Sequence, residues 1–377
     1  MEFRDLKKQY SINQKEIDEA IQQVLLDSNF ISGFQVQELE QKLAQYVGVK
    51  HCITCGNGTD ALQLALMAWN IGEKDAVFVP DFTFFSSGEV VPTVGATPVF
   101  VDVDKNTYNL DVQSLEQAIQ YTLEHTDLTP KAIIAVDLFG QPADYPEITR
   151  IADKYELLVL EDAAQGFGGA IAKQIACSFG NMATTSFFPA KPLGCYGDGG
   201  AVFTNNDEWA EKIKSLRIHG KGNDKYDNIR IGMNSRLDTL QAAVLLAKLP
   251  VFATRELPAV NQIAQMYSDK LQGIVMIPVI KPDMISSWAQ YTIQLQSENL
   301  RNKVAEYLRD KGIPTAVYYK KPMHQQKAFN NLLFDEDYYP ATNDLCQTVL
   351  SLPMHPYLQV EEIDNICKQI QCAINEG

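Results

Sequence analysis

Residues 186–200 read SFFPAKPLGCYGDGG, the most informative stretch of this 377-residue chain. They place one lysine, Lys191, between a strand-like apolar run and a glycine-rich turn. A lysine beside proline and glycine is most often a plain surface-loop residue, but the aromatic approach through Phe187 and Phe188 would shield this amine from water. Such shielding lowers the pKa of a lysine and favours its neutral, nucleophilic form. We therefore expect a reactive lysine at this position.

A second strand-like run, LLVLEDAAQ at residues 157–165, places an acidic residue near its end. Taken alone, Asp162 could simply cap a following helix. Together with Lys191 it has another interpretation. A lysine that forms a Schiff base and an aspartate that pairs with a pyridinium nitrogen are the two protein groups that pyridoxal 5'-phosphate (PLP) requires. Gln165 is placed to bond the region of the ring hydroxyl. The pair predicts a PLP site.

A glycine turn, GNGTD at residues 56–60, follows a third strand-like run and opens a helical pattern. A helix N-terminus with free amide groups, a hydroxyl and flexible glycines is suited to binding a phosphate. The alternative is that Thr59 or Asp60 merely caps the helix. Ser186, just before Lys191, would add a second hydroxyl. The turn is therefore predicted to bind the phosphate of the cofactor.

Aromatic residues, FTFF at 82–85, follow a fourth strand-like run. Aromatic side chains in this position usually belong to the core. One of them, Phe84, is nevertheless the candidate to stack on the cofactor ring, because aromatic faces pack well against one another.

Strand-like and helix-like segments alternate from about residue 50 to 205. The strands are predicted at His51–Cys55, Ala76–Pro80, Pro98–Asp102, Ala132–Leu138, Glu156–Asp162, Thr184–Phe188 and Ala201–Thr204. Near-continuous apolar strands with intervening helices predict an α/β fold whose mostly parallel sheet is covered on both faces. Ligands bind at the carboxyl ends of the strands in such sheets, and Asp162 and the turn at 56–59 fall at such ends.

The chain is predicted to form two domains. Residues 236–271 read as one long helix, interrupted or bent at Pro250 and Pro258. After it the pattern changes to strands at 274–280 and 291–295, a helix at 298–311 and a closing helix at 360–374. We therefore expect a large cofactor-binding domain at 1–250, including a helical N-terminal segment, and a small C-terminal domain at 251–377.

Composition excludes several classes of function. The net charge of −15 argues against nucleic-acid binding and against anionic membranes, since both need a basic face. The N-terminus is charged, and no apolar run reaches the roughly 20 residues that span a bilayer. The seven cysteines are scattered, and Cys52 and Cys55 lack a second pair to complete a zinc site, so no metal is expected. These features favour a protein of the reducing cytoplasm.

The order and spacing of these motifs resemble the DegT/DnrJ/StrS family of PLP-dependent nucleotide-sugar aminotransferases. The likeness covers essentially the whole chain, from FRDL at 3–6 to LPMHP at 352–356. Its most specific pieces are EDAAQ at 161–165, SFFPAKPLG at 186–194, GDGG at 197–200 and NSRLD at 234–238. Around Lys191 the sequence most resembles that of the 3-aminotransferases that act on oxidised UDP-N-acetylglucosamine derivatives.

The resemblance implies a fold-type-I transferase that works as a homodimer, with each active site built from both subunits. Lys191 would carry the cofactor, Asp162 would hold the pyridinium nitrogen, and Gln165 would lie near the ring hydroxyl. The residues implied for the phosphate are Gly58, Thr59, Asp60, Ser186 and, from the partner chain, Asn234. The residues implied for the substrate are Arg236, at a substrate carboxylate, and Tyr318, Tyr319 and His324, on the sugar-nucleotide side.

The resemblance also implies the reaction. An amino group would pass from L-glutamate to a 3-keto sugar of the UDP-N-acetylglucosamine type, including its uronic acids, in bacterial cell-surface polysaccharide synthesis. Lys191 would act as general base and acid. The chain departs from the family at Asn57, where serine or alanine is common, and at Tyr318, where histidine is common, which leaves the exact sugar open.

Four alternatives remain beside this interpretation. The enzyme could act on a 4-keto sugar carried by UDP or dTDP, or on amino acids alone as another PLP enzyme. A cofactor-binding regulator is a third alternative, although the acidic chain offers no basic segment for a DNA-binding module. The family's dehydratases are the fourth, but they carry histidine where Lys191 stands.

Overall fold

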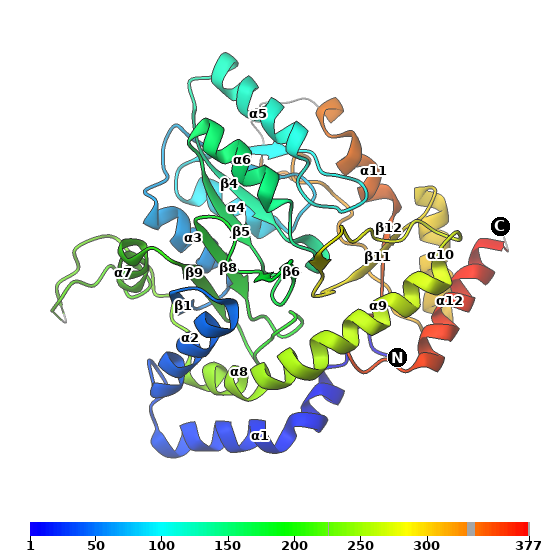
Figure 1. Cartoon of the computed structure of the whole chain (residues 1–377), viewed down its shortest axis with the longest axis horizontal. Helices are drawn as coiled ribbons and strands as arrows, with labels where there is room; N and C mark the ends of the chain where they lie inside the picture. The colour runs from blue at the N-terminus through cyan, green and yellow to red at the C-terminus, as the bar shows by residue number, and fades with distance from the viewer. Residues whose placement is uncertain (225, 330–335, 376–377) are drawn as a thin grey trace.

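The computed structural model describes residues 1–224, 226–329 and 336–375, and within them a seven-stranded sheet forms the centre of the fold (Figure 1). Its strands are β1 (His51–Cys55), β2 (Asp75–Pro80), β3 (Thr97–Val101), β4 (Thr129–Val136), β5 (Leu158–Asp162), β8 (Met182–Ser186) and β9 (Gly200–Thr204). Their order is β1-β9-β8-β5-β4-β2-β3. The five strands from β8 to β3 run parallel, and β9 runs antiparallel to both of its neighbours.

Helices cover both faces of this sheet, as its apolar strands require. Alternate residues of the strands point to opposite sides, so each face has its own hydrophobic core. One core contains side chains of α2 (Phe34–Val47), α5 (Val112–His125), α6 (Tyr145–Tyr155) and α8 (Thr239–Val251). The other contains side chains of α3 (Gly58–Ala68), α4 (Phe85–Thr93), α7 (Asp207–Leu216) and α11 (Pro340–Thr348). The predicted fold class is confirmed, and the predicted strand ends differ by only a few residues.

The long helix predicted from residue 236 is present in three parts. α8 leads through a π-helical segment (Phe252–Glu256) into α9 (Leu257–Leu271). Figure 1 shows these parts following one another along the base of the molecule, above the N-terminal helix α1 (Leu6–Asp27). Pro250 lies just before the π segment, and proline removes a helical hydrogen bond, so the irregularity falls where the sequence predicts it.

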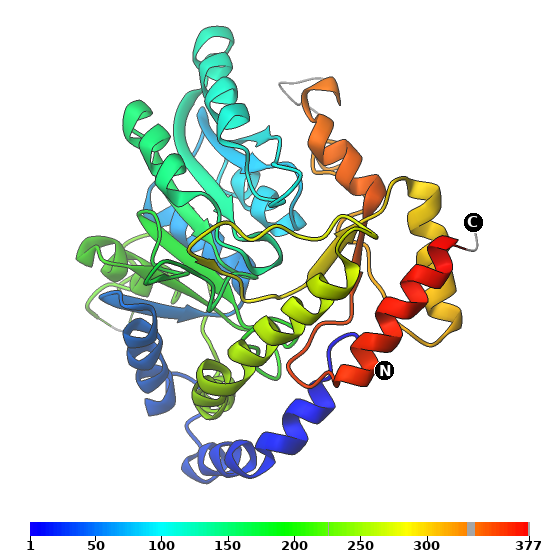
Figure 2. The same cartoon turned by 45° about the vertical axis from the view of Figure 1, so that its right-hand side comes forward.

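A third hydrophobic core lies at the C-terminal end of the chain. It is built on the antiparallel pair β11 (Tyr291–Gln294) and β12 (Val349–Leu352), with α9, α10 (Glu298–Asp310) and α12 (Val360–Asn375) packed around it. Figure 2 shows α9, α10 and α12 gathered on the side of the molecule away from the large sheet. The division of the chain into two domains near residue 250 stays a prediction.

The prediction of a strand at 274–280 is wrong. This segment makes only isolated bridges, at Val275 and Met276, because Pro278 has no amide hydrogen to donate to a strand neighbour. The pairing partner of β11 is instead β12, which the sequence analysis did not predict. A small sheet of β6 (Ala170–Ile171), β7 (Gln174–Ile175) and β10 (Met284–Ile285) was not predicted either. Among the described residues, no helix has the length and apolar character that crossing a bilayer requires.

Candidate active site

The site lies at the carboxyl edge of the sheet, where the register of the strands brings their last residues together. Val136 of β4 pairs with Asp162 of β5, and Asp162 pairs with Thr184 of β8. A cavity of about 770 Å³ opens at this edge. The residues that line it are Asn57, Gly58, Thr59, Asp60, Leu62, Thr83, Phe84, Ser86, Ser87, Glu89, Val136, Asp162, Ala164, Gln165, Ser186, Phe188, Ala190, Lys191, Asp198, Gln290, Tyr318 and Tyr319.

Lys191 reaches this cavity from the loop that follows β8. The loop is held at its base, because the amide of Phe187 donates to the Gly199 carbonyl at 2.7 Å and the amide of Cys195 donates to the Phe187 carbonyl at 2.8 Å. Burial lowers the pKa of the Lys191 amine. The Asp162 carboxylate opposes this shift, and the positive charge of Arg4 adds to it. The structure therefore gives Lys191 the more neutral amine that a nucleophile or a base requires.

Asp162 is 5% exposed at the floor of the cavity. The Ser87 hydroxyl donates to its Oδ2 at 2.8 Å, and the amide of Ala164 donates to its Oδ1 at 3.2 Å. Burial raises the pKa of this carboxyl, while both hydrogen bonds and the nearby Lys191 amine lower it. A cation placed against Asp162 would favour the charged carboxylate further. Asp162 is thus an oriented acid that suits a pyridinium nitrogen.

The N-terminus of α3 lines the side of the cavity at which the phosphate was predicted. Asn57 is the cap residue of this helix, and its Oδ1 accepts from the amide of Asp60 at 2.8 Å. The alternative in which Thr59 or Asp60 caps the helix is therefore wrong. The amides of Gly58 and Thr59 lie in the first turn, where no helical carbonyl can accept from them. They are available to an anion, in keeping with the predicted phosphate site.

Gly58 is also a steric requirement. A Cβ atom at this position would lie 2.7 Å from the Cβ of Ser186, closer than such atoms approach in proteins. The absence of a side chain lets the end of β8 meet the first turn of α3, so that Ser186 and Thr59 both line the cavity. The Thr59 hydroxyl lies 2.7 Å from the Ser86 hydroxyl. The Asp60 carboxylate accepts from the Ser235 hydroxyl at 2.6 Å, which holds the segment at 234–238 against this turn.

Gln165 and the aromatic residues form the remaining walls. Gln165 Oε1 accepts from the amide of Phe139 at 2.7 Å, and its Nε2 donates to the Tyr319 hydroxyl at 3.1 Å. These bonds fix the carboxamide of Gln165 beside Asp162. Phe84 remains 53% exposed, with its ring centroid 6.3 Å from that of Tyr319. Its ring is therefore accessible from the cavity, which Tyr318 also lines, and its stacking on the cofactor stays a prediction.

Three predicted site residues do not line the cavity of this chain. His324 is buried, with its Nδ1 2.6 Å from Asp81 Oδ2 and its ring stacked on Tyr339 at a centroid distance of 4.4 Å. Asn234 is exposed, and Arg236 is partly buried. Asn234 was expected to act in the site of a partner chain and Arg236 at a substrate carboxylate, and both roles stay predictions.

The structure adds residues that the sequence analysis missed. Ser87, which orients Asp162, is the second residue after the FTFF segment, and its place shortly after a strand end was the available signal. Gln290 lines the cavity with a buried Oε1 that has no hydrogen-bond partner among the described residues. Gln290 precedes β11, which belongs to the third core, and no local pattern indicates that this position faces Lys191.

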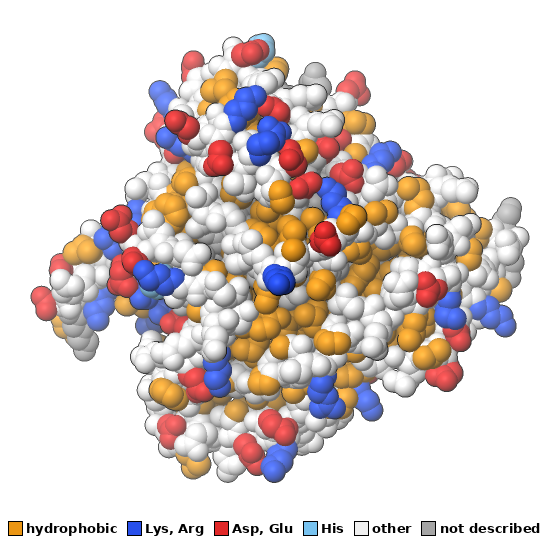
Figure 3. Space-filling view, viewed as in Figure 1, with side chains coloured by type: hydrophobic (Ala, Val, Ile, Leu, Met, Phe, Trp, Pro, Cys, Tyr) orange, Lys and Arg blue, Asp and Glu red, His pale blue; other side chains and the backbone are white. Residues whose placement is uncertain are grey.

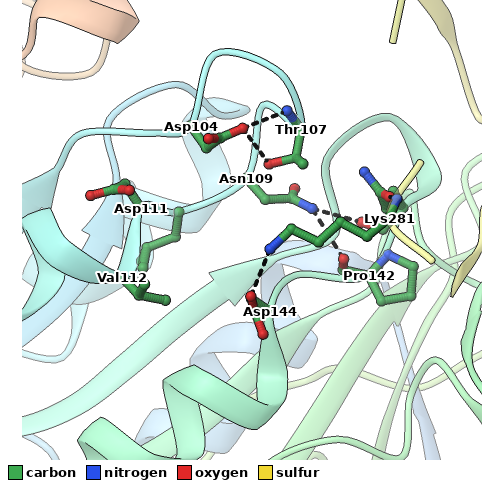
Figure 4. Close-up of a pocket in the computed structure, with 10 residues that line it drawn as sticks. Asp104, Thr107, Asn109, Asp111, Val112, Pro142, Asp144 and Lys281 are labelled. Atoms are coloured by element: carbon green, nitrogen blue, oxygen red, sulfur yellow. Dashed lines mark hydrogen bonds and ion pairs between the residues drawn. The ribbon is translucent and has the colours of Figure 1, made fainter. Parts of the chain in front are cut away.

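A second, smaller cavity of about 60 Å³ lies beside the loop after β3 (Figure 4). Its polar side chains bond mainly to one another or to the backbone. Asp104 accepts from the Thr107 amide at 2.8 Å, Lys281 donates to Asp144 at 2.6 Å, and Asn109 donates to the Pro142 carbonyl at 3.2 Å. These groups therefore stabilise the loops around them.

The geometry of the larger cavity defines a class of protein. An oriented buried carboxylate, a desolvated lysine and a helix N-terminus face one cavity at the carboxyl edge of a mostly parallel sheet. The close approach of Gly58 to Ser186 brings the Ser186 side chain to this helix N-terminus, where an anion would bind. These residues fit PLP, and the fold is that of a fold-type-I PLP-dependent transferase.

Comparison with known proteins gives the family. Residues 11–371 match the DegT/DnrJ/EryC1/StrS aminotransferase family. The chain belongs to this family and is a PLP-dependent aminotransferase. It is 45% identical over 370 residues to the UDP-2-acetamido-2-deoxy-3-oxo-D-glucuronate aminotransferase of Pseudomonas aeruginosa, covering 97% of this chain and 98% of the relative. It is 41% identical over 374 residues to a UDP-N-acetyl-3-dehydro-alpha-D-glucosamine 3-aminotransferase of Acidithiobacillus ferrooxidans, covering 98% and 97%.

Solved structures agree with this assignment. A DegT/DnrJ/EryC1/StrS aminotransferase from Brucella abortus is 47% identical, with a TM-score of 0.96, and the match covers 99% of each chain. The NtdA structure from Bacillus subtilis is 28% identical, with a TM-score of 0.86 over 96% of this chain and 82% of that one. It contains the cofactor PMP, the amino form of PLP.

Proposed function

We propose that this enzyme transfers an amino group from L-glutamate to the C3 carbonyl of a UDP-linked 3-keto sugar of the N-acetylglucosamine type, with the uronic acid as the first candidate. The observation that carries the proposal is the shared cavity of Lys191 and Asp162, whose volume of about 770 Å³ lies in the upper range of ligand sites. Such a volume leaves room beside the cofactor for a sugar nucleotide. An enzyme of amino acids alone would not need that room.

Two relatives support the choice of carbon. The names of the Pseudomonas and Acidithiobacillus proteins place the keto group of their substrates at C3, and both are at least 41% identical to this chain. A 4-keto sugar on UDP or dTDP is the second candidate. We also propose a cytoplasmic role in cell-surface polysaccharide synthesis, where buried free thiols such as Cys52 and Cys55 stay reduced.

The chain's own residues divide the work of the reaction. The α3 N-terminus and Ser186 would hold the cofactor phosphate, Gln165 would orient its ring, and Asp162 would hold a proton on the ring nitrogen. PLP supplies an electron sink for the charge that develops when a bond to the carbon beside the amino group breaks. Lys191 Nζ, whose pKa is lowered by burial, would take the proton from that carbon and deliver it in the return half-reaction.

The reverse reaction tests the substrate directly. The purified enzyme, with PLP, should convert a UDP-linked 3-amino-3-deoxy sugar and 2-oxoglutarate into the 3-keto sugar and L-glutamate, measured by mass spectrometry. The 3-amino uronic acid should be turned over at least about tenfold more efficiently than a 4-amino sugar on UDP or dTDP, because one well-placed contact contributes about 1.4 kcal/mol. A clear preference for the 4-amino sugar would replace the proposal with the second candidate.

We further propose that the active enzyme is a homodimer with shared sites. Apolar side chains are exposed around the α1–α2 connection, at Leu26, Phe30 and Phe34, and further along the chain at Ile231. Figure 3 shows a further broad apolar area on the viewed face, between the sheet and the long helix. Apolar surface is therefore exposed at more than one place on the molecule. Exposed apolar clusters are typical of surfaces that associate. The exposed Asn234 would then complete the phosphate site of the partner.

Complementation between two inactive variants tests the shared site. Lys191→Ala and Asn234→Asp should each be strongly impaired alone, the second because a carboxylate would repel a phosphate. Denatured together and refolded, they should regain about a quarter of wild-type activity, because half of the dimers are mixed and each mixed dimer has one intact site. Separately refolded samples serve as the control. Absence of any regain would place Asn234 in the same site as its own Lys191, or outside it.

A further inference from the structure

Two cations from distant parts of the sequence bind the loop that carries Lys191. The Arg4 Nη2 donates to the backbone carbonyl of Lys191 itself at 2.8 Å. The Lys248 ammonium group, on α8, donates to the backbone carbonyl of Gly194. The loop therefore has a side-chain donor at the lysine and another three residues further on. Neither contact takes part in the cavity lining, since Arg4 and Lys248 lie outside it.

The segment that carries Arg4 is fixed to the C-terminal part of the chain. The amide of Met354 donates to the Phe3 carbonyl at 3.1 Å, and the Phe3 ring lies 6.3 Å from the ring of Tyr318. On its other side, Asp5 caps α1 by accepting from the Lys8 amide at 2.8 Å. Arg4 is thus held between a helix start and the third core.

One buried carboxylate balances the charges behind the loop. Glu256, in the π segment, accepts from Gln9 Nε2 at 3.0 and 3.1 Å and from the Tyr357 hydroxyl. Its negative charge partly offsets the effect of burial, which lowers the pKa of Arg4 and lowers the pKa of Lys248 to about 8. The π segment between α8 and α9 therefore presents the counter-charge to both cations.

We propose that Arg4 and Lys248 are positioning residues for Lys191: they hold its loop by two backbone carbonyls, and the first of these bonds places the positive charge of Arg4 against Lys191 itself. The inference rests on the proposed role of Lys191 in the transfer reaction. The groups whose charges act on Lys191 are Asp162, which favours its protonated form, and Arg4, which opposes it. Through Arg4, the N-terminal segment therefore sets part of the balance between these two opposite charges.

Trace acetylation of the full-length, cofactor-free protein measures this balance without the reaction. Only a neutral amine reacts with acetic anhydride, so the pH midpoint for labelling Lys191, read by mass spectrometry, follows the pKa of its amine. Arg4→Met should raise that midpoint, since it removes a nearby positive charge that lowers the pKa of the Lys191 amine. Arg4→Lys should leave it near the wild-type value. Lys7→Met, which removes an exposed cation from the same segment, is the matched control and should change nothing.

A second readout measures the tether. The rate at which the cofactor-free protein captures PLP, followed by its visible absorbance band, should fall about tenfold in Arg4→Met, Arg4→Lys and Lys248→Met, the loss expected for one hydrogen bond to a charged group. Wild-type labelling midpoints in Arg4→Met would overturn the charge effect, and wild-type capture rates in Arg4→Lys and Lys248→Met would overturn the tether.

The outcomes also separate this inference from the proposed function. If Arg4→Met does not fold, as judged by circular dichroism, the capture rates of Arg4→Lys and Lys248→Met test the tether. The acetylation midpoint of Arg4→Gln then tests the charge effect. If the wild-type protein develops no visible band with PLP, the proposed function fails. The shift in the acetylation midpoint would still show whether Arg4 acts on Lys191.

Discussion

Replacing Lys191 with alanine should abolish the visible absorbance band of the lysine-bound cofactor and lower the rate of amino transfer by at least about 10⁴-fold, because one residue supplies both the covalent attachment and the proton transfer. The phosphate side of the site would remain, since the α3 N-terminus and Ser186 do not depend on the lysine. The variant should therefore still bind PLP, without the band. Spectra recorded before and after L-glutamate, with single-turnover rates, measure both effects.

The control for this variant is Lys173→Ala, an exposed lysine in the turn between β6 and β7, which should behave as wild type. Added methylamine should partly restore the rate of Lys191→Ala by providing a free amine in the emptied space. Such rescue would show that the rest of the site is intact in this variant. A Lys191→Ala protein that keeps the wild-type band or rate would refute the assignment of the cofactor lysine.

Asp162→Asn should produce the second-largest loss. The amide keeps the shape of the side chain and can still contact Ser87, but it carries no charge to hold a proton on the ring nitrogen. We expect kcat/KM to fall about 10²–10³-fold, the range measured when one oriented electrostatic contact is removed from an active site. The visible band should persist, because Lys191 is intact. Steady-state kinetics and spectra on the same sample separate these two results.

The same substitution has an effect of predictable sign on Lys191. Asp162 raises the pKa of the lysine amine, so its neutralisation should lower the pH midpoint for acetylation of Lys191, opposite to Arg4→Met. Ser87→Ala is the milder comparison. It removes one donor to the carboxylate and should cost about tenfold in kcat/KM. An unchanged kcat/KM in Asp162→Asn would mean that the ring nitrogen has another partner.

Much of the sheet could be predicted because its signals are local. Each strand from β1 to β9 of the large sheet is a short apolar run, and turn residues follow it within a few positions. Asp162 is the last residue of β5, and Lys191 follows the end of β8 by five residues. Since parallel strands end at one edge, their meeting in one cavity follows from the pattern alone. The C-terminal part lacks such a pattern. The segment at 274–280 is apolar but contains Pro278, and the partner of β11 is some 55 residues away at β12.

The cap of α3 shows that a local sequence can offer several candidates for one structural role. Asn57, Thr59 and Asp60 can all cap a helix, and the sequence does not rank them. In the structure Asn57 caps, which leaves Asp60 free to accept from Ser235. The role of Asp60 depends on Ser235, 175 positions away along the chain. The capping residue therefore could not be predicted from the local sequence.

The sequence by itself determined the α/β fold, the cofactor and the two residues at the centre of the site, because periodicity and strand-end chemistry act over a few neighbouring positions. Only the tertiary structure decided what surrounds them. It placed Ser87 on Asp162, Gln290 in the cavity wall, His324 on Asp81, and Arg4 on the carbonyl of Lys191, 187 positions along the chain. Contacts of that separation carry no local pattern. The hydrogen bonds among them form because a buried polar group must find its partner among the groups that the fold brings beside it.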